Sequence, residues 1–160
     1  MCQVPVTASE VVDRLKDLHE TAATCESITG GLICATLTSA PGASQAIRGG
    51  LITYATDLKT SLAAVDPAII LDHGVVSRPV ALAMAHGAAR ACQADWGVAV
   101  TGVAGPGPSE GVPAGTVWLA VVGPRAQAST MLEIPGDRAT VRQRVVEESL
   151  DFWWTLLSSP

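Results

Sequence analysis

Three residues with the side chains of a serine hydrolase lie close together in the sequence: Ser44, Tyr54 and Lys59. Lys59 follows an apolar segment and falls in the first turn of an expected helix, where the helix dipole and partial burial disfavour the ammonium form. A partly neutral lysine can take a proton from a serine hydroxyl. Tyr54, the only tyrosine, can reach the same cleft, and Ser44 lies in the preceding loop. Each residue is also commonplace in its position, so spacing alone leaves a catalytic and a structural role open.

Two glycine-rich turns, at residues 26–31 and 101–107, follow expected strands. Ligands of α/β proteins gather beyond the carboxyl ends of strands, where glycine lets backbone amides approach. A helix that begins at Gly30 or Gly31 would add its positive end, which suits an anion. Neither turn matches a phosphate-binding fingerprint, so tight packing turns are an equal alternative. The candidate ligand-binding residues here are Glu26, Thr29, Gly30, Gly31, Thr101, Gly102, Ala104 and Gly105.

Arginine, histidine and cysteine residues offer fewer sites. Arg138 and Arg142 lie one turn apart at the start of an expected helix and could clamp a phosphate. The three histidines are isolated and none has a G-x-S-x-G context. Cys25 could be reactive, although a small buried thiol is the more frequent case. The cysteines form no C-x-x-C pair and no Cys/His metal spacing, so we expect neither a metal nor a cofactor.

Alternating helical and strand patterns position these residues. Capping signals and apolar periodicity predict helices from residue 8 to about 19–21, over 31–38, from 56 or 57, over 67–73, from 77 to about 91, and from 137 to about 154. Apolar and β-branched runs predict strands at 22–26, 49–55, 96–103, 116–122 and 128–134, the last two as antiparallel neighbours. This order indicates one α/β domain over residues 1–160, a sheet sandwiched by helices.

Composition bounds the class of protein. The 160 residues are 48% hydrophobic but only 4% aromatic, so the core must rest on Ala, Val, Leu and Ile, with closely approaching helices and strands. The net charge of −5 and the lack of a basic run argue against nucleic-acid binding. No signal-peptide pattern and no run near the roughly 20 apolar residues of a membrane span occurs. We therefore expect a cytoplasmic protein with free thiols and no membrane partner.

Six short segments in this order resemble the CinA C-terminal domain family. They are residues 26–31, 49–54 with Lys59, 73–77, 101–106, 113–118, and 136–138 with Val141 and Arg142. Together they extend over about residues 8 to 155. The resemblance implies a three-layer α/β/α domain with a mixed sheet that forms homo-oligomers. It also implies a nicotinamide-nucleotide amidohydrolase, which converts nicotinamide mononucleotide to nicotinate mononucleotide and ammonia in pyridine nucleotide salvage.

The same resemblance assigns roles to the candidate residues. It places the nucleophile at Ser44, a base that later returns the proton to ammonia at Lys59, and an orienting or proton-relaying residue at Tyr54. Backbone amides of a glycine-rich turn would stabilise the oxyanion. Arg138 or Arg142 would hold the phosphate of this small-molecule substrate.

Some positions depart from the family pattern. Ile47 stands where an aromatic residue is common, and residues 107–109 read Gly-Pro-Ser where a further Gly-Gly is usual. Many members carry a molybdopterin-binding-like domain that this chain lacks, so we do not expect the pyrophosphatase activity linked to it. Two alternatives stay open: a non-catalytic nucleotide-binding or regulatory domain, and an amidohydrolase for another small amide.

Overall fold

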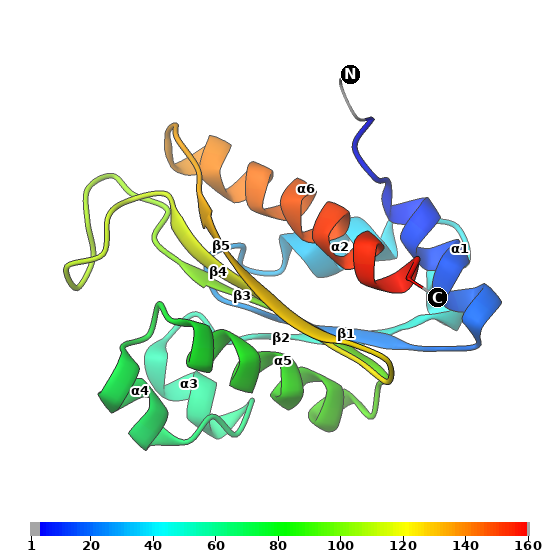
Figure 1. The fold of residues 1–160 in the computed structure, drawn as a ribbon, viewed down its shortest axis with the longest axis horizontal. Coiled ribbons are helices and arrows are strands. Elements are labelled where there is room, and N and C mark those ends of the chain that lie inside the picture. The colour runs from blue at the N-terminus through cyan, green and yellow to red at the C-terminus, as the bar shows by residue number, and fades with distance from the viewer. Residues whose placement is uncertain (1–3, 160) are drawn as a thin grey trace.

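The computed structural model describes residues 4–159 and shows one sheet covered on both faces by helices (Figure 1). One face carries α1 (Ala8–Leu18), α2 (Leu32–Thr38) and α6 (Arg138–Leu157). The opposite face carries α3 (Thr56–Ser61), α4 (Pro67–His73) and α5 (Arg78–Cys92). The predicted three-layer α/β/α architecture is confirmed. No helix in residues 4–159 is long and apolar enough to cross a membrane.

The sheet has five strands in the order β2-β1-β3-β4-β5. β1 (Ala22–Glu26) pairs in parallel with both β2 (Ile47–Ile52) and β3 (Trp96–Gly102). β4 (Thr116–Val122) and β5 (Gln127–Glu133) extend it as an antiparallel pair, β4 being antiparallel to β3 as well. The sheet is therefore mixed, as predicted.

The starts of α1 and α6 follow the capping signals of the sequence, whereas α3 begins after Ala55 without a side-chain cap. The Thr7 side chain accepts a hydrogen bond from the amide of Glu10, whose carboxylate accepts from the amide of Thr7 in return. Asp137 caps α6 through the amide of Thr140. Such caps satisfy amides that have no partner within the helix. They explain why these boundaries could be predicted closely.

One strand boundary was predicted wrongly. The run at 49–55 predicted a strand over those residues, but β2 begins at Ile47 and ends at Ile52. Thr53 donates its amide to the carbonyl oxygen of Glu26 at 2.9 Å, and the chain then turns away toward α3. Tyr54 consequently lies beyond the sheet, in the connection between β2 and α3.

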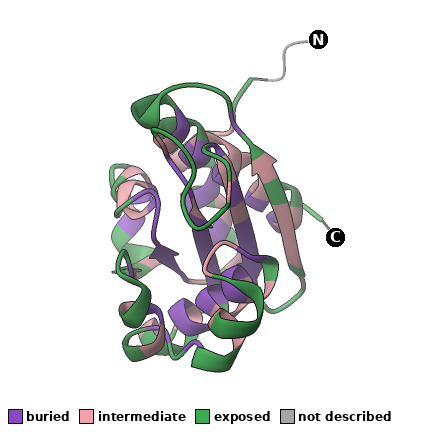
Figure 2. Ribbon diagram, turned by 90° about the vertical axis from the view of Figure 1, so that its left-hand side faces the viewer, coloured by how far each residue is buried: buried purple, intermediate pink, exposed green. Residues whose placement is uncertain are grey.

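Small residues let α5 pack closely on the sheet, as the composition indicated. A Cβ at Gly97 of β3 would lie 2.0 Å from the carbonyl oxygen of Ala85, which no side chain could tolerate. The core on the other face of the sheet, under α1, α2 and α6, contains the larger side chains. The ring centroids of Trp96 and Trp153 lie 6.4 Å apart there. Buried residues fill the middle strands and the helix faces against them, whereas exposed residues gather in the connections (Figure 2).

Strand register brings three connections to one edge of the sheet. Glu26, the last residue of β1, pairs with Ile52 at the end of β2 and with Val100 near the end of β3. The segments that follow these strands must therefore lie side by side. Ligand sites of α/β proteins form at this carboxyl edge.

Candidate active site

A cavity of about 420 Å³ opens at the carboxyl edge of the parallel strands. Its walls are the turn after β1, the segment from β2 through α4, the loop between β3 and β4, and the start of α6. This volume is typical of small-molecule sites. The lining residues are Ser27, Ile28, Tyr54, Thr56, Lys59, 73–76, 101–110, Val112 and Arg138.

Lys59 is a buried lysine at the floor of this site. The residue is 0% exposed to solvent, and it is also one of the residues that line the cavity. Nζ lies 2.7 Å from the carbonyl oxygen of Thr53 and 3.1 Å from Oγ of Ser27. Both partners are neutral groups. Burial therefore lowers the pKa of Lys59 below the ordinary lysine value of 10.5.

This geometry suits proton transfer from Ser27 to Lys59. In its neutral form the amine can donate one hydrogen to Thr53 and direct its lone pair at the hydroxyl of Ser27. The hydroxyl can then lose its proton as its oxygen attacks an electrophile. The pair has the chemical requirements of a nucleophile and its general base.

The chain holds Lys59 through the connection between β2 and α3. Thr53 is tied to β1 by its amide, and its hydroxyl lies 3.4 Å from the sulfur of Cys25. Burial raises the pKa of Cys25 to about 11, so this residue is a thiol at neutral pH. Cys25 is thus a buried thiol that contacts Thr53, and this packing role is the more frequent of the two considered above.

Ser44 lies before β2 as predicted but not beside Lys59, which its predicted role as the nucleophile would require. It belongs to the short 3₁₀ helix Ala43–Gln45, which precedes β2, and its side chain is exposed. The amide of Ala22, at the start of β1, donates to the carbonyl oxygen of Ala46 there. Lys59 follows the opposite end of β2. Six strand residues span about 20 Å, so the strand keeps Ser44 and Lys59 apart.

Glu26 and Thr29 serve the fold rather than the cavity, contrary to prediction. The buried carboxylate of Glu26 accepts hydrogen bonds from the amides of Ile33 at 2.8 Å and Cys34 at 3.0 Å, in the first turn of α2. The Thr29 hydroxyl donates to the same carboxylate at 2.6 Å. The amides at the start of α2 therefore already have acceptors, the side-chain oxygens of Glu26.

Gly30 and Gly31 also lie outside the cavity lining, contrary to prediction. Both have positive φ angles, +59° and +104°, which glycine adopts without strain. Gly31 is the N-cap of α2. These glycines make the tight turn that joins Ser27 to α2, and this packing role was the alternative considered for them.

The second glycine-rich turn does line the cavity. Thr101 donates its hydroxyl to the carbonyl oxygen of Val75 at 3.0 Å, which links β3 to the segment after α4. Gly102, Ala104 and Gly105 form the adjoining wall. The structure therefore brings this predicted group to the same cavity as Lys59.

The two candidate arginines have different surroundings. Arg138 lines the cavity and donates to the carbonyl oxygen of Gly105 and to the hydroxyl of Tyr54, both at 2.9 Å. Arg142, one turn later, donates to the carbonyl oxygens of Ile28 at 3.1 Å and of residue 29 at 3.2 Å, away from the cavity lining. Tyr54 is 60% exposed, and its hydroxyl contacts Arg138 rather than Lys59.

Sequence reasoning missed Ser27, although it had singled out the turn that contains this residue. The available signal was the position of Ser27 directly after a buried strand that neighbours the strand before Lys59. His73 and Glu110 also line the cavity without having been predicted. No group of three potential metal-ligating His, Cys, Asp or Glu side chains occurs in the described range 4–159.

The fold and the cavity define an α/β protein with a serine–lysine pair beyond the carboxyl ends of its parallel strands. Residues 6–157 match the model of the CinA C-terminal domain. The chain belongs to this family. A CinA-like protein of Frankia casuarinae is 44% identical over 88% of the chain, and one of Mycobacterium marinum is 48% identical over 76%.

Solved structures show the same fold. A CinA superfamily protein from Escherichia coli superposes with a TM-score of 0.90 at 31% identity, covering 93% of this chain and 87% of that one. A competence/damage inducible protein from Agrobacterium tumefaciens gives 0.86 at 34% identity, covering 98% and 99%. The chain spans about a third of the length of the curated relatives, 33% for the Frankia protein and 29% for the Mycobacterium protein.

Proposed function

We propose that this chain hydrolyses the carboxamide of nicotinamide mononucleotide, with Ser27 as the nucleophile and Lys59 as the general base. The observation that carries the proposal is the 3.1 Å separation between Lys59 Nζ and Ser27 Oγ in a cavity large enough for a small molecule. The nature of the substrate is supported by the resemblance to nicotinamide-nucleotide amidohydrolases. Ser27 takes the role that the resemblance placed at Ser44, because Ser44 lies at the other edge of the sheet.

The first half of the reaction forms an acyl-enzyme. Ser27 Oγ bonds to the carboxamide carbon while its proton passes to Nζ of Lys59. The resulting tetrahedral intermediate collapses as the carbon–nitrogen bond breaks. The departing nitrogen takes the proton back from Lys59 and leaves as ammonia.

The second half releases the acid. Neutral Lys59 takes a proton from a water molecule, whose oxygen attacks the ester carbon. The bond to Ser27 then breaks and the proton returns to the serine oxygen. The product is nicotinate mononucleotide, and the serine–lysine pair is restored.

Arg138 is the residue that we assign to the substrate phosphate. Its guanidinium stands at the cavity wall, held by the carbonyl oxygen of Gly105 and the hydroxyl of Tyr54. A guanidinium can give paired hydrogen bonds to phosphate oxygens. The partly exposed ring of Tyr54 lines the same cavity and offers an apolar surface to a pyridine ring.

The test is ammonia release from nicotinamide mononucleotide by the purified chain, with nicotinamide riboside as the substrate that lacks a phosphate. We expect turnover that is faster with the nucleotide. Ser27→Ala should lower the rate by about 10³-fold or more. Ser44→Ala is the matched control, the same substitution at the opposite edge of the sheet, and should keep the wild-type rate within about twofold.

Three results would contradict the proposal in different ways. Equal activity of Ser27→Ala and wild type would reject the nucleophile. Release of ammonia from another carboxamide but not from the nucleotide would keep the chemistry and reject the substrate. A thermal shift with the nucleotide, without ammonia even at high enzyme concentration, would support a binding domain.

A further inference from the structure

Arg142 holds the backbone of the turn that begins at Ser27. Its Nε donates to the carbonyl oxygen of Ile28 at 3.1 Å, and its Nη2 donates to that of Thr29 at 3.2 Å. A Cβ added to Gly30 would lie 3.4 Å from Nη2, so the guanidinium also packs directly against the turn. Three consecutive residues after Ser27 therefore contact one arginine of α6.

These contacts fix the orientation of the peptide planes next to Ser27. In a trans peptide the N–H points away from the C=O of the same plane. The carbonyl of Thr29 faces Arg142, and the amide of Gly30 in the same plane donates to the carbonyl oxygen of Ser27 at 3.1 Å. That second bond fixes the plane of the Ser27–Ile28 peptide, in which the amide of Ile28 points away from the Ser27 carbonyl.

The amide of Ile28 is a free donor directly beside Ser27. The amide of Ser27 itself donates to the carbonyl oxygen of Val100 at 3.1 Å and is therefore engaged. For the amide of Ile28, no acceptor occurs within the part of the chain that the structure describes. Ile28 lines the cavity together with Ser27. A free amide next to a nucleophile is the type of group that stabilises an oxyanion.

We infer that Arg142 is a positioning residue, which holds the turn so that the amide of Ile28 faces the carbonyl oxygen of a substrate attacked by Ser27. This inference rests on the proposed function for its nucleophile. It replaces the phosphate-binding role predicted for Arg142, whose Nε and Nη2 donate to backbone carbonyls and which lies outside the cavity lining. Arg142 acts through the backbone and touches no reacting atom.

The first test compares Arg142→Met with Arg142→Lys in the hydrolysis of nicotinamide mononucleotide. Methionine keeps an unbranched apolar stem but removes every donor, so kcat should fall by about 10- to 100-fold while KM stays within about twofold. Full removal of an oxyanion donor costs about 10²–10³ in rate, and a displaced donor should lose less. Lysine can still donate to one carbonyl and should restore part of kcat.

Arg144→Met is the matched control on the same helix. Arg144 is exposed and pairs with Glu147 and Glu148, so its loss removes the same charge without touching the turn. Its kcat should equal that of wild type. The pH profile of kcat/KM should keep its midpoint in Arg142→Met, since Lys59 does not contact Arg142. All rates are taken at a temperature at which thermal unfolding shows each variant to be folded.

A second readout needs no knowledge of the substrate. A fluorophosphonate forms a bond between phosphorus and Ser27 Oγ as the phosphorus–fluorine bond breaks, with fluoride leaving and the hydroxyl proton passing to Lys59. The phosphoryl oxygen takes the place of the oxyanion. Intact-mass analysis should show slower labelling of Arg142→Met than of wild type, and none of Ser27→Ala.

The outcomes separate this inference from the proposed function. Wild-type kcat and labelling rate in Arg142→Met would overturn the inference and leave the proposed function standing. A raised KM with unchanged kcat would also overturn it, in favour of substrate binding by Arg142. If wild type labels at Ser27 but does not hydrolyse the nucleotide, slower labelling of Arg142→Met supports the inference while the substrate is rejected. If wild type shows no labelling at Ser27 and no hydrolysis, both the inference and the proposed function are overturned.

Discussion

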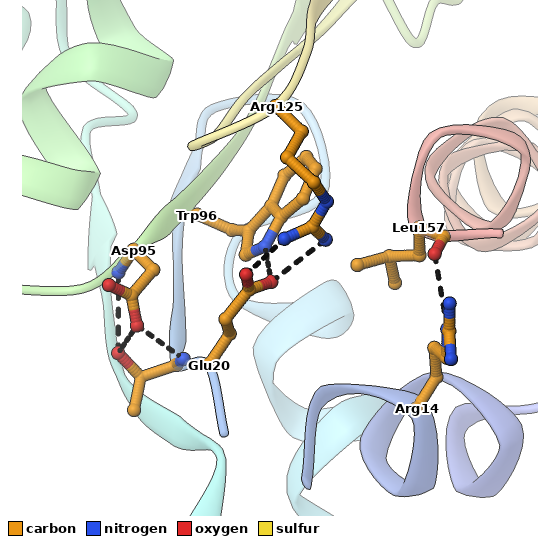
Figure 3. Close-up of polar contacts among 7 residues, drawn as sticks. Arg14, Glu20, Asp95, Trp96, Arg125 and Leu157 are labelled. Atoms are coloured by element: carbon orange, nitrogen blue, oxygen red, sulfur yellow. Dashed lines mark hydrogen bonds and ion pairs between the residues drawn. The ribbon is translucent and has the colours of Figure 1, made fainter. Parts of the chain in front are cut away.

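Polar groups have different partners at the two ends of the parallel strands. At the edge where β1 and β3 begin, Glu20 accepts hydrogen bonds from Trp96 Nε1 at 2.7 Å and from the guanidinium of Arg125 (Figure 3). The same guanidinium lies 5.4 Å from the centroid of the Trp96 ring. The neighbouring Thr21 donates its amide and its hydroxyl to Asp95 at 2.8 and 3.0 Å. Charges at this edge face partners of opposite charge or strong donors.

At the carboxyl edge the buried amine of Lys59 has only neutral partners, a carbonyl and a hydroxyl. A buried ammonium without a counter-ion destabilises the folded state relative to its neutral form. The edge with Glu20 and Arg125 therefore stabilises the sheet through its ion pair, whereas the carboxyl edge retains a buried amine that lowers stability and that we propose as a base. Sites of function commonly carry such a stability cost.

Replacement of Lys59 by methionine should give the largest effect and the clearest separation of function from stability. We expect hydrolysis to fall by about 10³-fold, because the proposed general base is lost. The free energy of unfolding should stay equal or increase, since an apolar side chain removes the cost of burying the amine. Ammonia release and thermal unfolding measure the two quantities.

The control for this variant is Lys16→Met, which changes the only other lysine of the chain. Lys16 lies on α1 and pairs with Asp13, remote from the cavity. Its activity should match wild type. A Lys59→Met protein that is markedly less stable than wild type would show that Lys59 stabilises the carboxyl edge, and the contrast between the edges would fail.

The pH dependence of kcat/KM is the second way to sharpen the contrast. Only neutral Lys59 can accept the proton of Ser27, so the rate should rise about tenfold per pH unit below the pKa of Lys59 and then level off. Because burial lowers this pKa, the plateau should begin below pH 10.5. His73 also lines the cavity, and His73→Gln should leave the profile unchanged if Lys59 is responsible. A rate that falls with rising pH would contradict the assignment.

Local signals were enough to predict most of the fold. Capping residues at Thr7, Ser77 and Asp137 mark helix starts because each accepts a hydrogen bond from the amide three residues further along, a spacing that a single sequence displays. Apolar runs gave the strands because buried strands need continuous hydrophobic faces. The end of β2 was missed because Thr53 and Tyr54 have strand-forming side chains, yet the chain leaves the sheet there to enter α3.

The site was harder to predict because its partners are distant in sequence. Ser27 and Lys59 are 32 residues apart and meet only through the register of β1 and β2. Ser44 is closer to Lys59 along the chain, but a whole strand separates them in space. Glu26 resembles a ligand-binding residue in sequence, and only the position of α2 shows that its carboxylate caps that helix. Lys59 could be found because a lysine shortly after an apolar run is a local feature, although it lies in the last turn of the short α3 rather than in the predicted first turn.

Loss of the Glu20 charge should give the smallest effect, confined to stability. The hydrogen bond from Arg125 lowers the pKa of Glu20, so the stabilisation is present above the ordinary glutamate pKa and disappears as pH falls through the lowered value. Glu20→Gln should therefore lower Tm at pH 7 by about 2–4 °C. The difference from wild type should shrink as pH falls through the lowered pKa of Glu20, because the wild-type side chain then becomes protonated as well.

Activity provides the other half of this test. Glu20 lies at the edge of the sheet opposite Ser27 and Lys59, so hydrolysis by folded Glu20→Gln should equal that of wild type. Glu133→Gln, at an exposed position of β5, is the matched control for loss of one carboxylate and should leave Tm unchanged. A fall in kcat without a fall in Tm would mean that the two edges are coupled through the strands. Stability and catalysis would then not be divided between the edges in the way that the contacts indicate.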